Sequence, residues 1–172
     1  MKSLKVVATL ALSLLLVFSA SAQKDKEKRK SPPAQVSQKV GDATITIDYS
    51  RPSKRGRDIF GGLEDYGKVW RTGANESTWI ELSKDVTVEG KKLPAGKYGL
   101  FSIPGEDEWT IIFNKKWDGW GAYEYKESDD VLRVKVKASS TDDVVEMLTF
   151  EIEKSGDVIF AWDQTKVEFS IR

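Results

Sequence analysis

Four segments of this chain alternate strictly between apolar and polar residues. Residues 43–49, 132–137, 148–153 and 166–172 each place an apolar side chain at every second position. An extended backbone sends successive side chains to opposite faces, so this period produces one apolar and one polar face. Each segment is therefore predicted to be a half-buried antiparallel strand.

Turn-forming residues separate these segments from shorter apolar runs. Glu89-Gly90, Pro94-Ala95-Gly96, Pro104-Gly105 and Ser155-Gly156 stand between them, and such combinations are typical of tight turns between strands. Only residues 141–147 are predicted to form a brief helical turn. About nine strands with no long helical period indicate an all-β fold, a single antiparallel β-sandwich of jelly-roll-like type over residues 35–172.

The N-terminus has the pattern of a cleaved signal peptide. Lys2 and Lys5 precede an apolar run at residues 6–18, and Ala20-Ser21-Ala22 provides a small-residue cleavage site. The run is short for a membrane span. We therefore predict a signal peptide over residues 1–22 and an exported mature chain, periplasmic or extracellular, with no transmembrane segment after cleavage.

A charged segment, QKDKEKRKSPPA, follows at residues 23–34 and is called the lead-in segment below. It has almost no apolar side chains to bury and contains two prolines. We predict a disordered linker that connects the signal peptide to the domain.

The composition excludes several classes of function. The chain has no histidine and no cysteine, which removes Ser–His–Asp triads, thiol nucleophiles and the commonest metal ligands. Its 27 basic and 27 acidic residues give no net positive field for nucleic acid. We predict no cofactor and no metal, assign no catalytic residue, and expect no nucleic-acid partner.

Residues 51–76 form a long connection that is rich in glycine and arginine and lacks alternation. Arginine suits carboxylates and other anions because its guanidinium is a planar fork of donors. Acidic residues in the same stretch allow a second interpretation, an ion-pair network that pins the loop. Large apolar residues such as Phe60 and Trp70 predict that the loop folds onto the sandwich.

Aromatic residues gather at residues 114–125. Trp117, Trp120 and Tyr123 either cap the end of the core or form a stacking surface for a ligand such as a saccharide. Three other tryptophans, Trp79, Trp109 and Trp162, lie inside predicted strands and are expected in the core.

Two sequence blocks resemble a known family. They are RPSKRGRDIFG at residues 51–61 and VWRTGANE at residues 69–76, and residues 93–101, 108–114 and 120–125 resemble the same family. From about Val40 to the C-terminus the chain is similar to exported bacterial proteins known only as domain of unknown function 2911. The resemblance implies export and a β-rich fold, and it implies no activity.

The leading hypothesis is a non-catalytic ligand-binding or envelope-binding module for a saccharide, a peptide or an acidic polymer. Its candidate ligand-binding residues are Arg55, Arg57, Arg71, Asn75, Glu76, Trp117, Trp120 and Tyr123. The alternative is a hydrolase or lyase of an extracellular polymer that uses Glu76, oriented by Arg71, with a second carboxylate. A third possibility is a purely structural domain that binds a protein partner through an apolar patch or a sheet edge.

Overall fold

The computed structural model describes Lys26 and residues 28–172, so the predicted signal peptide lies outside the described residues. Within this part of the chain no helix is long and apolar enough to cross a membrane. The described residues contain nine strands and one short 3-10 helix: β1 (Pro33–Val40), β2 (Ala43–Ser50), β3 (Trp79–Leu82), β4 (Val86–Val88), β5 (Lys91–Leu93), β6 (Gly96–Ile103), β7 (Glu108–Asn114), η1 (Glu127–Asp129), β8 (Asp130–Ile152) and β9 (Asp157–Ser170).

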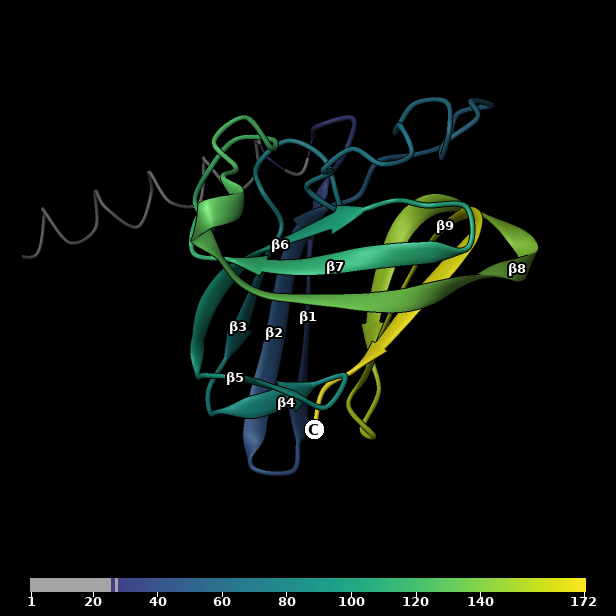
Figure 1. Cartoon of the computed structure of the whole chain (residues 1–172). Coiled ribbons are helices and arrows are strands. Elements are labelled where there is room, and N and C mark those ends of the chain that lie inside the picture. Colours follow the sequence, from purple (N-terminus) through teal and green to yellow (C-terminus); the bar gives the residue numbers. More distant parts are fainter. Residues whose placement is uncertain (1–25, 27) are drawn as a thin grey trace, which may run out of the picture.

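Seven strands form one sheet in the order β1-β2-β3-β6-β7-β8-β9, and β4 and β5 form a separate hairpin. Every pairing between neighbouring strands is antiparallel. The sheet is strongly curled, so that β2 and the β7–β8 pair cross on opposite sides of one core (Figure 1). The predicted all-β, antiparallel fold is confirmed, and its two layers are parts of one continuous sheet.

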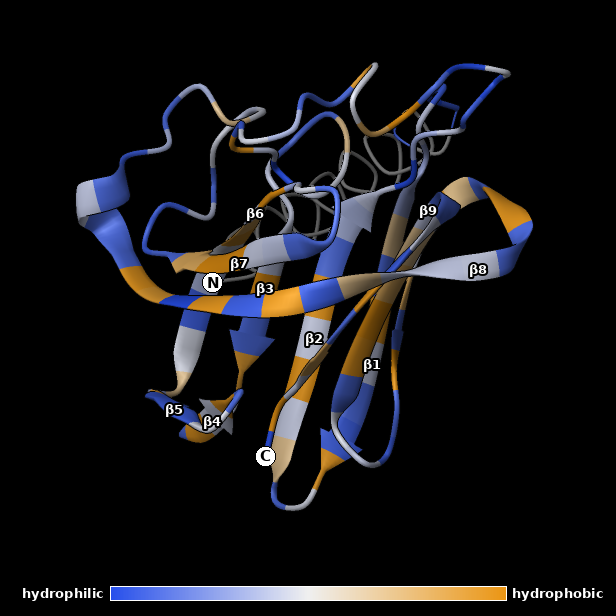
Figure 2. Cartoon of the chain, turned by 45° about the vertical axis from the view of Figure 1, so that its right-hand side comes forward, coloured by the Kyte–Doolittle hydropathy of each residue, from blue (hydrophilic) through white to orange (hydrophobic). Residues whose placement is uncertain are grey.

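The predicted alternation is visible along β2 and β8 (Figure 2). In β2, Ile45, Ile47 and Tyr49 are buried, while the residues between them face outward. The segments predicted at 132–137 and 148–153 belong to one long strand, β8. Its first half pairs with β7 and its second half with β9.

The helical turn predicted at residues 141–147 is wrong. This stretch lies within β8, where the register with β9 shifts on both sides of the pair Val145–Asp163. Asp163 has a φ of 56° at this irregularity. Bulges increase the twist of a strand pair, which lets β8 and β9 bend away from the rest of the sheet.

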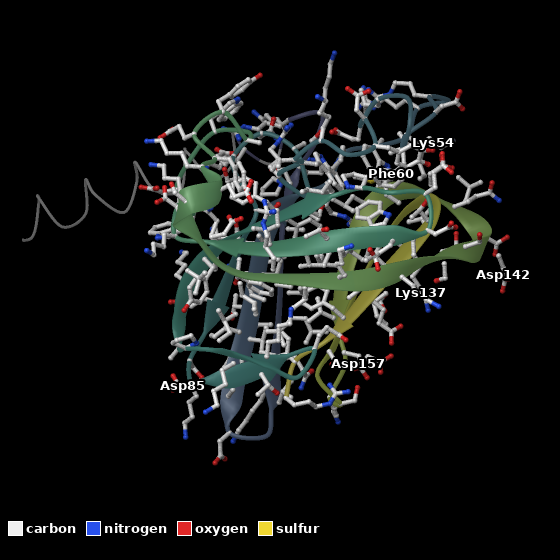
Figure 3. All side chains as sticks on the ribbon, viewed as in Figure 1. Lys54, Phe60, Asp85, Lys137, Asp142 and Asp157 are labelled. Atoms are coloured by element: carbon white, nitrogen blue, oxygen red, sulfur yellow. The ribbon has the colours of Figure 1, made fainter. Side chains whose placement is uncertain are left out.

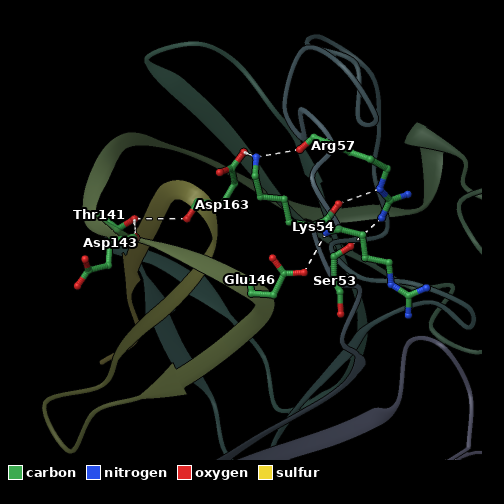
Figure 4. A network of polar contacts seen from close by, with 8 residues as sticks. Ser53, Lys54, Arg57, Thr141, Asp143, Glu146 and Asp163 are labelled. Atoms are coloured by element: carbon green, nitrogen blue, oxygen red, sulfur yellow. Dashed lines mark hydrogen bonds and ion pairs between the residues drawn. The ribbon is translucent and has the colours of Figure 1, made fainter.

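Residues 51–57 close the curled sheet against β8 and β9. The backbone of Pro52 and Lys54 pairs with Leu148 and Glu146, through N···O distances of 3.0 and 2.7 Å. Lys54 also forms an ion pair with Asp163 at 2.6 Å, in which both side chains are mostly buried (Figure 4).

The core contains a cluster of four aromatic rings that lie edge to face or stacked. Trp109 and Trp162 are almost fully buried, as predicted, and Phe60 and Trp70 from the 51–76 connection pack against them. Figure 3 shows Phe60 directed toward the interior, beneath the loops. The prediction that this connection folds onto the sheet is confirmed. Trp79, which was also expected in the core, is only partly buried and faces outward.

Two long connections lie together at one end of the molecule, the upper end in Figure 1: β2–β3 and β7–β8. The N–H of Ser77 donates to Gly119 O at 2.9 Å, and the N–H of Gly121 donates to Asn75 O at 3.0 Å. The hydroxyl of Ser77 also donates to Gly121 O at 2.7 Å. These bonds hold the two connections side by side, and the paired connections form one wall of the pocket described below.

Candidate binding pocket

A cavity of ≈ 190 Å³ opens where the two connections meet the lead-in segment and the outer face of β2 and β3. This volume exceeds the roughly 150 Å³ that admits a benzene ring. We call it the carboxylate–indole pocket. It is lined by Lys26, Pro33, Asp48, Tyr49, Ser50, Glu76, Ser77, Trp79, Trp117, Asp118 and Gly119.

The floor of the pocket is one row of residues across neighbouring strands. Asp48 on β2 is the register partner of Trp79 on β3, and Trp79 is the partner of Gly99 on β6. Neighbouring strands lie about 4.8 Å apart, so residues in one row are in direct contact. The row continues to Gln35 on β1, whose amide donates to Asp48 at 3.2 Å.

Gly99 lets the 115–119 loop cross the sheet. A Cβ at this position would overlap the carbonyl oxygen of Lys116 and the ring of Phe101. Because Gly99 has no side chain, the loop lies directly on β6 and brings Trp117 beside Trp79. Lys97 Nζ lies between the two indoles, 3.4 Å from the ring centroid of Trp79 and 4.1 Å from that of Trp117.

Two of the three carboxylates that line the pocket, Asp48 and Glu76, have pKa values shifted in opposite directions. Burial raises the pKa of Asp48, and the hydrogen bond from Gln35 with the charges of Lys26 and Lys97 offsets this only in part. Burial would also raise the pKa of Glu76, but the hydrogen bond from Arg29 and the charges of Lys26 and Arg29 outweigh it and lower the pKa.

The family described as "Protein of unknown function (DUF2911)" covers residues 31–171. The chain belongs to this family. The resemblance seen in the sequence is thereby confirmed at the level of the family. The DUF2911 region includes all nine strands and every pocket residue except Lys26. Comparison with curated proteins and with solved structures gives no match.

Of the eight candidate site residues, Glu76 and Trp117 line the pocket. Asn75 lies beside it and donates to Ser31 O of the lead-in segment at 3.0 Å. Trp120 forms a bridge with Glu76 but lies outside the lining, and Tyr123 is 88% exposed. The prediction of a core cap does not apply to these rings, because Trp117 and Trp120 are also exposed.

Arg55 and Arg57 lie at a separate surface depression of ≈ 360 Å³ with Lys30, Ser31 and Ser53. The Arg57 guanidinium donates to the carbonyl oxygens of Lys54 and Ser53 at 3.0 and 2.7 Å. Arg55 donates from its side chain to Lys30 O at 3.3 Å. In both cases the guanidinium binds backbone carbonyls instead of the acids expected from an ion-pair network.

Arg71 occupies a third position, between Glu64 and the 120–125 loop. Its Nε is buried and has no hydrogen-bond partner among the described residues. Burial lowers the pKa of Arg71, and the charge of Glu64 opposes this. Glu76 pairs with Arg29 at 2.8 Å, so the proposed orientation of Glu76 by Arg71 is replaced by a contact from the lead-in segment.

The lining residues that sequence reasoning missed include Asp48 and Trp79. It also missed Lys97 and Gly99, which lie outside the lining but contact the indoles or the loop that carries Trp117. The alternation of residues 43–49 puts Asp48 on the polar face of its strand, where it lies. Alternation does not tell which outward-facing residues of different strands are neighbours. In the described part of the chain no three acidic side chains gather in a way that would hold a metal ion.

Proposed function

We propose that this chain is an exported, non-catalytic binding module whose ligand site is the carboxylate–indole pocket. The observation that carries the proposal is the meeting of Asp48 and Trp79, neighbours across β2 and β3, with Glu76 and Trp117 of the two connections at one cavity outside the core. Half-exposed rings beside polar groups hold saccharide rings or peptide side chains by stacking and hydrogen bonds. An acidic polymer fits this pocket poorly because Asp48 and Glu76 would repel it.

A second candidate function, hydrolysis of a polymer, is favoured by one observation. Asp48 and Glu76 line the same cavity, and their pKa values are shifted upward and downward respectively. Such a pair provides a proton donor and an ionised partner, as general acid–base hydrolysis requires. The Arg29 contact to both oxygens of Glu76 argues against it, because that carboxylate is already engaged.

The test is a ligand panel measured by thermal unfolding and by tryptophan fluorescence. The chain from residue 23 is mixed with neutral saccharides, amino sugars, and neutral, acidic and basic peptides. A ligand that binds only the folded state raises Tm in a saturable way. We expect one class to do so, with loss of the shift in Trp117→Ala and Glu76→Gln.

Trp120→Ala is the matched control, because Trp120 is an exposed tryptophan of the same loop outside the lining. A shift that survives Trp117→Ala but disappears in Trp120→Ala would move the site to the exposed loop and refute the pocket. Shortened polymer in the same incubations, abolished by Asp48→Asn, would establish hydrolysis in place of simple binding. No shift with any ligand would refute the binding proposal.

A further inference from the structure

The lead-in segment already places two cationic side chains on Glu76, and one of them, Lys26, lines the carboxylate–indole pocket. Lys26 Nζ lies 3.4 Å from Glu76 Oε1. Arg29 Nη1 donates to both carboxylate oxygens of Glu76, at 2.9 and 2.8 Å. A segment whose composition predicts no stable structure of its own is therefore held by the charge of the pocket.

Without the lead-in segment, carboxylates outnumber cationic side chains around the pocket. Asp48 and Glu76 contribute two carboxylates, and Lys97 contributes one ammonium beside them. Asp118 shares the ammonium of Lys116 with Glu124, at 2.9 and 3.1 Å. Added cations would offset the negative charge, and the cationic side chains of Lys26 and Arg29 now lie beside Glu76.

The aromatic walls favour the same kind of ligand. Indole faces attract cations through the charge distribution of the ring, and the two indoles of the pocket already hold the Lys97 ammonium between them. The carboxylate and indole groups thus both favour a cationic ligand, whereas a neutral sugar would be held only by stacking on the rings.

Neighbouring residues bind the backbone of the lead-in segment as well as its charges. Asn75 Nδ2 donates to Ser31 O at 3.0 Å, and Arg55 Nη2 donates to Lys30 O at 3.3 Å. The N–H of Arg51 donates to Pro32 O at 2.9 Å. Donors aimed at successive carbonyl oxygens recognise a peptide chain, which an amino sugar would not satisfy.

We infer that the pocket recognises a basic peptide segment of a protein partner, and that Lys26 and Arg29 occupy it as an internal copy of this ligand. The inference rests on the proposed binding function and specifies its ligand. The internal contacts are displaceable, because ion pairs between side chains that remain about one-third exposed or more contribute little net stability. An external basic peptide then competes with the lead-in segment for Glu76.

The experiment uses a synthetic peptide with the sequence of residues 26–32 and a second peptide with glutamine at the positions of Lys26 and Arg29. Binding to the chain from residue 23 is followed by tryptophan fluorescence and calorimetry. The K26Q/R29Q variant should bind the first peptide up to about fivefold more tightly than the wild type, because removing a competitor increases the fraction of open sites. Binding should weaken with salt and should be lost when Glu76→Gln is added to this variant.

K28Q/K30Q is the matched control, since it removes the same charge from the same segment at positions with no ion pair to Glu76. If both double variants bind the peptide more tightly by the same factor, the gain reflects overall charge alone. Lys26 and Arg29 would then not act as an internal copy of the ligand. Equal binding of the glutamine peptide would overturn cation recognition. If a saccharide raises Tm but the peptide does not bind, this inference is refuted and the proposed function stands. If no probe binds to K26Q/R29Q, both are refuted.

Discussion

At the scale of single residues, Glu64 is the most perturbed carboxyl of the molecule outside the pocket. Burial raises the pKa of Glu64 to about 7, and the charge of Arg71 offsets this only in part. The ionised form of Glu64 is thus disfavoured in the folded chain at neutral pH. A carboxyl that still titrates near pH 7 is one of the few pH-sensitive groups available to a chain without histidine.

Glu64→Gln should change how stability depends on pH. A raised pKa means that the folded state binds more protons than the unfolded state between the ordinary pKa of 4.5 and about 7. Wild-type stability therefore loses a contribution as pH rises through this window, and the glutamine variant does not. We expect the two proteins to have similar Tm values at pH 4.5 and the variant to have the higher Tm at pH 8.

The control is Glu106→Gln, which removes the same charge from an exposed turn between β6 and β7. This variant should follow the wild-type curve at every pH. If the Glu64→Gln curve also stays parallel to the wild type from pH 4.5 to 8, the Glu64 carboxyl titrates outside this window and the burial argument is wrong.

At the scale of elements, the pocket depends on how the 115–119 loop crosses β6 at Gly99. A side chain there would collide with the backbone of Lys116, which cannot move aside as a flexible side chain can. Gly99→Ala should therefore lift the loop, separate Trp117 from Lys97, and destabilise the fold by about 1–3 kcal/mol. Urea unfolding measures the stability, and the Tm shift with the ligands above tests whether the pocket still binds.

Gly119→Ala provides the comparison for stability, because a Cβ there would lie 3.3 Å from the Ser77 hydroxyl and in ordinary contact with the ends of two flexible side chains, Glu124 and Lys116. We expect a smaller loss of stability than in Gly99→Ala. Wild-type stability and binding in Gly99→Ala would show that the loop is not held by close contact with β6.

Strands were predictable from the sequence because side-chain alternation is a local property. β2 and the two halves of β8 follow it, and the turns at Glu89-Gly90 and Ser155-Gly156 fall where expected. The continuity of β8 was not predictable, since residues 141–147 contain polar residues that also favour a helix start. Their strand conformation depends on pairing with β9 and with residues 52–54.

The pocket was only partly predictable for a related reason. Glu76 and Trp117 stood out because they lie in segments with unusual composition. Asp48 and Trp79 come from regular strands, and their meeting depends on the register between β2 and β3. Register is fixed by the whole sheet and by its turns, so a single sequence does not reveal which outward-facing residues share a row.

At the scale of the whole molecule, the hydrophobic core and the lead-in segment are separable. The core contains buried residues from Ala43 onward, with Ala34 and Val36 of β1 packed against it. The sheet is closed by residues 52–54 against β8, and β4 pairs with the backbone of Arg172. Lys26 and Arg29 contribute ion pairs to Glu76 at the surface of the pocket.

Deletion of all residues before Ser31 should therefore leave the fold intact. Exposed ion pairs contribute about 0–1 kcal/mol, so we expect Tm to fall by no more than about 4 °C. This difference should depend on pH, because Arg29 and Lys26 lower the pKa of Glu76. Their stabilising contribution is present above the ordinary pKa of 4.5 and is lost as pH falls through the lower folded value.

A longer deletion, through Val36, removes half of β1, including its pairing with β2 from Pro33 to Val36. It should lower Tm much more, because Ala34 and Val36 leave the core and the outer edge of β2 loses its hydrogen-bonded partner. Equal losses of Tm in the two deletions would mean that the lead-in segment is part of the cooperative fold. It would then be a structural strap across the pocket, and an external peptide would have no open site to enter.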